Sequence, residues 1–353
     1  MTTPSTSSAE TTGGLRYLAP ETDRPTCAAP WQRTVSFSVC LPAYQVEPWI
    51  GAAVASAINQ TYPAHEIIVC DDGSTDRLDA ALAPYEDHVT LLRQPNQGAA
   101  AARNTASSAA SGDFVVFLDP DDRFVPCRLE RLRELAGIRP DLDILTTDAF
   151  IEFEDRVIGR YYTEENRFVV DDQRQGILGA NFLFGLLAVR RSALAAIGGF
   201  DESLPDVYDW DCWLRLILAG ARAGMVDEPL AVYTLRPGSS SSSRLRLLRG
   251  RQNVLAKACA RHGLSGVEHG VARDALVRVQ QALALEEVKE LLVLRGPDRR
   301  RRAWTAATRA EASLTSRFRA LGAVLSPALA RRLLIRQRHR AEGNPAAVLA
   351  ARQ

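Results

Sequence analysis

Residues 112–122 read GDFVVFLDPDD, and this stretch decides the fold class. The apolar run Phe114–Leu118 predicts a buried strand, because a short apolar run bounded by turn residues is typical of a strand covered on both faces. The acidic segment Asp119–Asp122 ends that strand. A strand that stops at a cluster of carboxylates predicts both a sheet and a polar site at its edge.

Three further apolar runs precede this stretch, and each is followed by turn residues. They read VSFSVCL at residues 35–41, HEIIVC at 65–70 and VTLLR at 89–93. Helical patterns separate the runs, at about residues 48–59, 76–85 and 98–110. This alternation of strand and helix predicts an α/β domain with a Rossmann-like, mostly parallel central sheet flanked by helices.

Loop segments follow three of the predicted strands, at residues 42–47, 71–76 and 119–122, and the last two are rich in Asp. In open parallel sheets, ligands bind beyond the carboxyl ends of the strands. We therefore expect these three segments to form one binding site.

The segment Asp119–Asp122 has two interpretations. Its carboxylates repel one another unless a cation or hydrogen-bond donors satisfy them, and Mg²⁺ and Mn²⁺ prefer such oxygen ligands. A solvated turn in which Asp122 caps the next helix explains the same residues. Asp71-Asp72-Gly73-Ser74 is equally open, as a common turn and cap or as a carboxylate that binds a base or ribose.

The charge distribution divides the chain near residue 240. Residues 1–240 carry 20 basic and 34 acidic side chains, whereas residues 241–353 carry 23 basic and 8 acidic ones. Residues 1–33 are rich in Thr, Ser, Pro and Ala, and the chain after about residue 243 is almost wholly helical in pattern. We expect a disordered leader (1–33), a catalytic domain (34–240) and a helical, Arg-rich C-terminal extension (241–353).

The C-terminal extension has two interpretations. Its densest basic segments are Arg299–Arg302 and ALARRLLIRQRHR at residues 328–340, and the latter has an amphipathic pattern. Such a helix could lie on an anionic membrane surface, or it could pack on the catalytic domain or a second subunit in self-association. The segment lacks interleaved aromatic residues, which argues against nucleic acid.

The six cysteines contain no C-x-x-C pair, and Cys40 and Cys70 lie inside apolar runs. This usage indicates reduced thiols and no zinc site. The leader has no apolar core of a signal peptide, and no run approaches the 18 apolar residues of a membrane span. We expect a cytoplasmic protein, or one peripheral to the inner face of the membrane.

The motifs, taken together and in order, resemble the family 2 glycosyltransferases. The resemblance covers roughly residues 35–240 and rests on a series of short segments. They are VSFSVCLPAY, INQTYP, EIIVCDDGSTD, NQGAAAARN, GDFVVFLDPDD, GGFDESLP and DWDCWLRL. It implies the GT-A fold and a nucleotide-diphospho-sugar as the donor substrate.

The resemblance also implies residues that bind the nucleotide. Pro42, Ala43 and Tyr44 match the segment along the base and ribose, and Glu47 matches an acidic position of the same loop. Asp72, the second Asp of the DDGS motif, matches the residue that hydrogen-bonds the base.

Four further residues match the reaction centre of the family. Arg103 matches the Arg of the A-R-N segment at the nucleotide site. Asp119 and Asp121 match the motif that binds diphosphate and a divalent metal, Mg²⁺ or Mn²⁺. Asp209 matches the general base, below the sugar at the start of a helix.

The chain departs from the family at several positions. Gln45 stands where Asn is common, Tyr208 stands where Glu often precedes the base, and Arg236 stands where a His often follows the last strand. Asp211 is an alternative base, but a helix turns residues 209 and 211 about 200° apart, so only one can face the sugar.

Two other segments invite structural interpretations. Gly198 and Gly199 are expected to form a tight turn that positions the following loop. Trp210 and Trp213 are expected to lie in the core or in the wall of the acceptor site.

The resemblance implies an inverting glycosyltransferase. It would move a sugar from a UDP- or dTDP-linked donor to a hydroxyl acceptor on a glycan, glycolipid or small molecule. A catalytically silent sugar-nucleotide-binding or scaffold protein of the same fold is the alternative, because of Tyr208 and Arg236.

Overall fold

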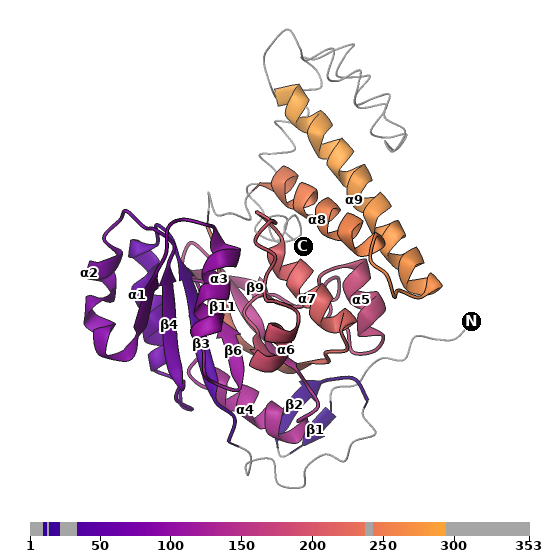
Figure 1. Cartoon of the computed structure of the whole chain (residues 1–353). Coiled ribbons are helices and arrows are strands. Elements are labelled where there is room, and N and C mark those ends of the chain that lie inside the picture. Colours follow the sequence, from indigo (N-terminus) through magenta and orange to yellow (C-terminus); the bar gives the residue numbers. More distant parts are fainter. Residues whose placement is uncertain (1–9, 13, 22–33, 237–242, 294–353) are drawn as a thin grey trace. The chain divides into compact units, whose positions relative to one another are not determined.

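The computed structural model describes residues 10–12, 14–21, 34–236 and 243–293. The chain divides into two compact units. The first consists of residues 1–177 and 181–235, and the second of residues 178–180 and 236–353. Figure 1 shows the elements of both units, coloured along the sequence.

The first unit is built on one mixed sheet with the strand order β1-β2-β11-β8-β10-β6-β3-β4-β5, to which β7 and β9 add at β11 and β8. The strands are β1 (Glu10–Thr12), β2 (Leu15–Leu18), β3 (Phe37–Ala43), β4 (Glu66–Asp71), β5 (Thr90–Arg93), β6 (Phe114–Phe117), β7 (Arg123–Phe124), β8 (Ile144–Phe153), β9 (Arg156–Arg160), β10 (Ala188–Arg190) and β11 (Ala223–Leu235). β5, β4, β3 and β6 run parallel, β8 and β11 run parallel, and β10 is antiparallel to both β6 and β8. The predicted α/β class is confirmed, and the four parallel strands are the four apolar runs of the sequence.

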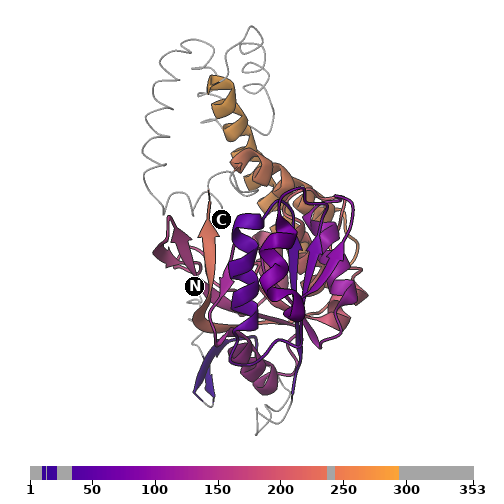
Figure 2. The same cartoon turned by 90° about the vertical axis from the view of Figure 1, so that its left-hand side faces the viewer.

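Helices cover both faces of this sheet, as Figures 1 and 2 show. They are α1 (Glu47–Ile58), α2 (Leu78–Leu82), the 3₁₀ helix η2 (Ala83–His88), α3 (Ala99–Ala109), α4 (Arg128–Ile138), α5 (Gln173–Gly179), α6 (Arg191–Ala196) and α7 (Tyr208–Leu218). Alternate residues of β3 (Phe37, Val39, Leu41) share one core with the apolar residues of α1 and α4. On the other face α3 packs against β3 and β4, and Phe117 of β6 contacts Trp213 of α7. The carboxyl ends of the parallel strands are thus bordered by α3 and α7.

The N-terminal segment differs from the disordered leader expected for residues 1–33. Residues 10–12 and 15–18 form β1 and β2, and β2 pairs antiparallel with β11. Leu15 and Tyr17 are fully buried, because the alternation of a short strand points both side chains into the core. A composition dominated by Thr, Ser and Pro concealed this four-residue strand.

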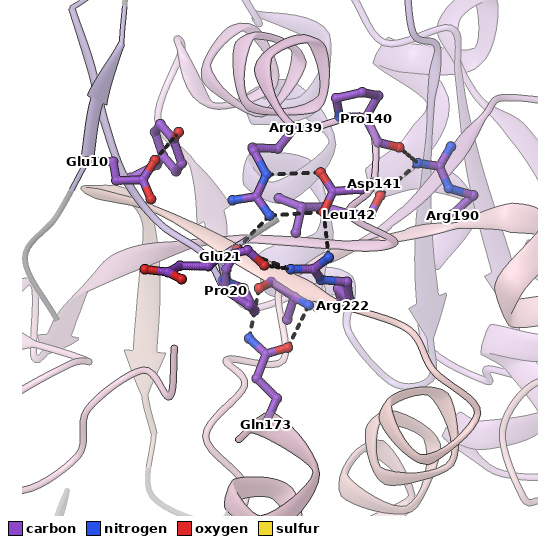
Figure 3. A network of polar contacts seen from close by, with 12 residues as sticks. Glu10, Pro20, Glu21, Arg139, Pro140, Asp141, Leu142, Gln173, Arg190 and Arg222 are labelled. Atoms are coloured by element: carbon purple, nitrogen blue, oxygen red, sulfur yellow. Dashed lines mark hydrogen bonds and ion pairs between the residues drawn. The ribbon is translucent and has the colours of Figure 1, made fainter. Parts of the chain in front are cut away.

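A buried ionic network holds the chain just after β2 (Figure 3). Arg139 makes a two-pronged ion pair with Asp141, with both N···O distances at 2.9 Å, and donates to the carbonyl of Pro20 at 2.7 Å. Arg222 also contacts Asp141, at 3.3 Å, and donates to the carbonyls of Pro20 and Glu21. The network ties the N-terminal segment to the residues that lead into β8 and β11.

The second unit contains a helical hairpin, α8 (Arg244–Cys259) and α9 (Gly266–Val293). Ser265 and Glu268 form a reciprocal capping box at the start of α9, with distances of 2.7 and 3.2 Å. The basic segments 299–302 and 328–340 lie outside the described residues. Within the described part of the chain, no helix has both the length and the apolar character needed to cross a bilayer.

Candidate active site

The end of β6 carries the acidic segment that the sequence singled out. The backbone N–H of Asp122 donates to the carbonyl of Asp119 at 3.0 Å, which folds the segment into a turn. Asp122 is buried and its Oδ1 accepts from the backbone N–H of Thr234 in β11 at 2.8 Å, so it holds the turn to β11 instead of capping a helix. Asp119 and Asp121 are only partly buried, so a ligand can reach both.

Arg103 of α3 joins this turn to the start of α7. Its guanidinium donates through one terminal nitrogen to Asp119 Oδ1 and through the other to the phenol oxygen of Tyr208. The guanidinium carbon also lies 5.1 Å from the ring centroid of Tyr208 and 5.9 Å from that of Phe200. Arg103 therefore connects α3 to the turn after β6 and to the start of α7.

Like charges gather around Asp119. Burial and the nearby carboxylates of Asp121 and Asp209 raise the pKa of Asp119, against the lowering effect of Arg103. Burial alone would lower the pKa of Arg103, but the charge of Asp119 and the contact with Tyr208 raise it, so Arg103 remains a cation. Three carboxylates and one guanidinium leave a net negative charge that a divalent cation would relieve.

Asp209 and Asp211 occupy different environments on α7. Asp211 is buried and its Oδ2 accepts from Arg215 at 2.6 Å, and Arg215 in turn donates to the carbonyls of Ile197 and Gly199. Asp209 is partly buried, and its carboxylate makes no hydrogen bond or ion pair with any residue that the structure describes. Asp209 thus has a carboxylate free to accept a proton, whereas Asp211 serves to hold the 197–199 turn.

The loop after β3 lies beside the loop after β4. Pro42 and Ala43 are buried at the end of β3, while the side chain of Tyr44 is 50% exposed. Glu47 pairs with Arg77 at 2.7 Å, accepts from the backbone N–H of Arg77 at 3.2 Å, and is held by its own N–H to Asp76. Glu47 therefore fastens the two loops together, and Tyr44 is the side chain of this segment that is open to a planar ligand.

Asp72 is buried at the end of β4 and faces the loop that leads into α3. Its Oδ1 accepts from Gln94 Nε2 at 2.8 Å and from the backbone N–H of Gln97 at 2.9 Å, and its Oδ2 accepts from the N–H of Gly98 at 2.8 Å. A carboxylate oxygen has two lone pairs, so Oδ2 can accept one more hydrogen bond. Asp72 orders the entry into α3, the helix that carries Arg103.

The structure thus joins Arg103 and Asp119 directly and brings Asp121 and Asp209 within electrostatic reach of Asp119. The other expected site residues follow the neighbouring strands β3 and β4 at the same edge of the sheet. In the described part of the chain, no three His, Cys, Asp or Glu side chains meet where they alone could hold a metal ion.

Sequence reasoning missed two residues that shape the site. Asn104 follows Arg103 and hydrogen-bonds both backbone groups of Phe200, at 2.8 and 2.9 Å. Tyr208 stands out in the sequence only as a departure from the family, yet it contacts Arg103. The A-R-N motif is a local sequence signal for Asn104. Nothing in the sequence near residue 208 indicates that Tyr208 contacts Arg103.

Comparisons with known proteins agree with this geometry. The sequence model described as Glycosyl transferase family 2 matches residues 38–198. The Bacillus subtilis protein named putative teichuronic acid biosynthesis glycosyltransferase TuaG is 30% identical over 224 residues, which are 61% of this chain and 84% of that protein. The Escherichia coli protein WfaP, named as a UDP-Glc:alpha-D-GlcNAc-diphosphoundecaprenol beta-1,3-glucosyltransferase, is 29% identical over 227 residues, or 62% of this chain and 84% of its own.

Solved structures show the same fold. The mannosyltransferase PcManGT of Pyrobaculum calidifontis, solved with GDP-Man and Mn²⁺, superposes on this chain with a TM-score of 0.57 at 22% sequence identity. The superposition covers 93% of this chain and 89% of the PcManGT chain. TarS 1-349 of S. aureus superposes with a TM-score of 0.57 at 17% sequence identity, and the match covers 86% of this chain and 91% of the TarS chain. The GT-A architecture is confirmed, and the family favours an enzyme over a silent scaffold. The chain belongs to the family 2 glycosyltransferases and transfers a sugar from a nucleotide sugar.

Proposed function

We propose that this glycosyltransferase inverts the anomeric carbon, with Asp209 as the general base. The observation that carries the proposal is the contrast on α7, where Asp211 is ion-paired and Asp209 keeps an unengaged carboxylate among the described residues. A hydroxyl is a poor nucleophile until a base takes its proton during attack. One base opposite one leaving group gives a single direct displacement, and this inverts the anomeric carbon.

Asp209 has two sources of positive potential beside it. It lies in the first turn of α7, where the exposed N–H groups of the helix favour a negative charge. Arg103, which touches Asp119 and Tyr208, adds a positive charge nearby. A carboxylate at this point can accept the proton of the acceptor hydroxyl.

We further propose that Asp121, with Asp119, holds Mg²⁺ or Mn²⁺ when the donor binds. The donor set fits, because both are oxygen ligands at a strand end where carboxylate charges accumulate. Oxygens of the donor diphosphate would complete the ligand set, since the described residues offer no three-ligand cluster. Such a cation neutralises the charge that develops on the departing diphosphate.

The donor is proposed to be UDP- or dTDP-linked. WfaP, by its name, takes glucose from UDP-Glc, and TarS has been solved with UDP and with UDP-GlcNAc, which supports UDP. Tyr44 is the exposed aromatic side chain beside the end of β3 where a base could stack. The acceptor is proposed to be a hydroxyl of a glycan or glycolipid, and the diphosphoundecaprenol-linked GlcNAc in the name of WfaP supports a lipid-linked one.

A donor screen tests this proposal. Purified full-length protein is incubated with UDP-Glc, UDP-GlcNAc, dTDP-Glc or GDP-Man, with Mn²⁺, Mg²⁺ or EDTA, and thermal shift and nucleotide release are measured. Binding to the native state raises the melting temperature by mass action. We expect one uridine or thymidine donor to give both signals and EDTA to remove them. Signals with GDP-Man alone, or equal signals in EDTA, would contradict the donor class or the metal respectively.

A further inference from the structure

The guanidinium of Arg103 is nearly enclosed, with 8% of the residue exposed, yet it is only partly satisfied. An Arg side chain has five N–H donors. Among the described residues, Arg103 uses two of them, one on Asp119 and one on Tyr208. The remaining donors are therefore available to an anionic ligand at the carboxylate cluster.

Tyr208 is itself fixed by the aromatic core. Its ring meets the ring of Phe200 edge to face, with centroids 6.0 Å apart. Phe200 in turn packs on Phe117 of β6 at 5.1 Å and on Trp213 of α7 at 5.6 Å. Packed aromatic rings thus connect the sheet to the phenol oxygen of Tyr208, which accepts a hydrogen bond from Arg103.

We propose that Tyr208 is a positioning residue for the donor site. Its phenol oxygen holds the Arg103 guanidinium in the one orientation that contacts Asp119 and presents the remaining N–H groups to the donor diphosphate. This inference rests on the proposed function, since it requires a diphosphate donor beside Asp119.

The chemistry of a phenol explains why it suits this position. A carboxylate at residue 208 would form an ion pair with Arg103 and cancel most of its charge. A neutral phenol accepts the same hydrogen bond and leaves the positive charge to Asp119 and the diphosphate. Burial raises the pKa of Tyr208, against the lowering effect of Arg103, so the phenol stays neutral at physiological pH.

Tyr208→Phe tests the proposal, because it keeps the ring and removes only the oxygen. We expect the Kd of UDP, measured calorimetrically with Mn²⁺, and the KM of the donor to rise about tenfold, the effect of one hydrogen bond to a charged group. We expect kcat to change less than about twofold, because Asp209 is untouched.

Tyr17→Phe is the matched control. Tyr17 is a buried tyrosine of β2 whose phenol donates a hydrogen bond to Glu10 at 2.6 Å, and it is not among the candidate site residues. We expect this variant to lower the melting temperature at least as much as Tyr208→Phe and to leave the Kd of UDP unchanged.

A double-mutant cycle with Arg103→Lys separates positioning from simple packing. Lysine keeps the charge but lacks the planar fork that reaches two partners at once. We expect Tyr208→Phe to have less than about a twofold effect on UDP affinity when it is combined with Arg103→Lys, because the bond it removes is already lost.

Tyr208→Glu tests the role of the neutral partner. We expect it to weaken UDP binding in EDTA by about tenfold or more, because the new carboxylate neutralises Arg103.

The outcomes distinguish this inference from the proposed function. Wild-type turnover together with an unchanged KM and Kd in Tyr208→Phe would overturn the role of Tyr208 and leave the function intact. Additive effects in the cycle, a fall in kcat with unchanged KM, or unchanged metal-free binding in Tyr208→Glu would also overturn it. A wild-type protein that binds neither UDP nor any donor with Mn²⁺ would overturn both.

Discussion

Asn104 and Phe200, 96 positions apart in the sequence, are joined by a two-way hydrogen bond. Asn104 Nδ2 donates to the carbonyl of Phe200 at 2.9 Å, and Asn104 Oδ1 accepts from the N–H of Phe200 at 2.8 Å. Since Arg103 is the preceding residue of α3 and Phe200 supports the ring of Tyr208, this pair fixes α3 to the turn before α7. It therefore supports the contact between Arg103 and Tyr208.

Replacement of Asn104 by Ala is expected to loosen that connection. The variant leaves two backbone groups of Phe200 without partners, which costs about 1–3 kcal/mol for each group that stays buried. We expect a lower free energy of unfolding in urea and a reduced kcat/KM. Asn59→Ala is the control, because Asn59 is exposed and its side chain makes no hydrogen bond within the described residues. Equal stability and activity in both variants would show that the Phe200 contact is unimportant.

The Gly198-Gly199 turn offers a matched pair of substitutions. Both glycines have positive φ, +76° and +72°, where an L side chain costs roughly 1–2 kcal/mol. A Cβ at Gly198 meets nothing within 4 Å, whereas one at Gly199 would lie 2.5 Å from Asn104 Oδ1. We expect Gly198→Ala to show only the backbone cost in urea unfolding. Gly199→Ala should lose more stability and, through Asn104, activity; equal losses in the two would refute the steric argument.

The buried Asp141 predicts how stability depends on pH. Burial would raise its pKa, but the hydrogen bonds and charges of Arg139 and Arg222 outweigh this and lower it. Its contribution is therefore complete above the unfolded-state pKa, about 3.9, and is lost as the pH falls through the lower folded-state pKa. We expect Asp141→Asn to reduce the free energy of unfolding by about 3–5 kcal/mol at pH 7, because it leaves buried arginine charge uncompensated.

Urea titrations of wild type and Asp141→Asn at pH 7 and at successively lower pH measure this. The difference in the free energy of unfolding between the two proteins should shrink only as the pH falls through the folded-state pKa of Asp141. Asp143→Asn is the comparison, since the Asp143–Arg190 pair is partly exposed and is expected to contribute under about 1 kcal/mol. A constant difference at every pH would contradict the ionic origin.

Much of the fold could be predicted because each parallel strand is a contiguous apolar run closed by turn residues. An apolar run is a weaker indication of a strand where a loop can bury the same side chains. The run Leu183–Val189 is buried, but only Ala188–Arg190 pair as β10, since the neighbouring residues bury their side chains from a loop. Pro84 similarly converts the end of the helix expected to reach Tyr85 into the 3₁₀ helix η2.

The sequence proposes candidate site residues, and their roles stay predictions, but it does not reveal the contacts among them. Short motifs single out Arg103, Asp119 and Asp209 as candidates, because each lies beside a recognisable strand or helix end. The contact between Arg103 and Tyr208 joins residues 105 positions apart, and no periodicity encodes it. Trp210 and Trp213 left two interpretations, and their burial now places both in the core.

The metal proposal predicts a specific loss in Asp121→Asn. Removal of one negative oxygen ligand should weaken the Mn²⁺-dependent part of UDP binding by about tenfold, or about 1.4 kcal/mol, and leave the binding in EDTA unchanged. Isothermal titration of UDP with and without Mn²⁺ gives both values. The control is Asp87→Asn, an exposed carboxylate in η2. If Asp121→Asn binds Mn²⁺–UDP as wild type does, Asp121 is not a ligand.

The two acids of α7 give the sharpest test of the reaction itself. Asp209→Asn removes a carboxylate that supports no other described residue, so we expect kcat to fall by a factor of about 10²–10⁴, with UDP affinity and melting temperature near wild type. Asp211→Asn leaves Arg215 without its buried partner and should instead lower the free energy of unfolding by about 3–5 kcal/mol. At a temperature where Asp211→Asn is still folded, it should retain most of its kcat, because the carboxylate of Asp211 is directed at Arg215. A folded Asp211→Asn without activity, beside an active Asp209→Asn, would transfer the role of base from Asp209 to Asp211.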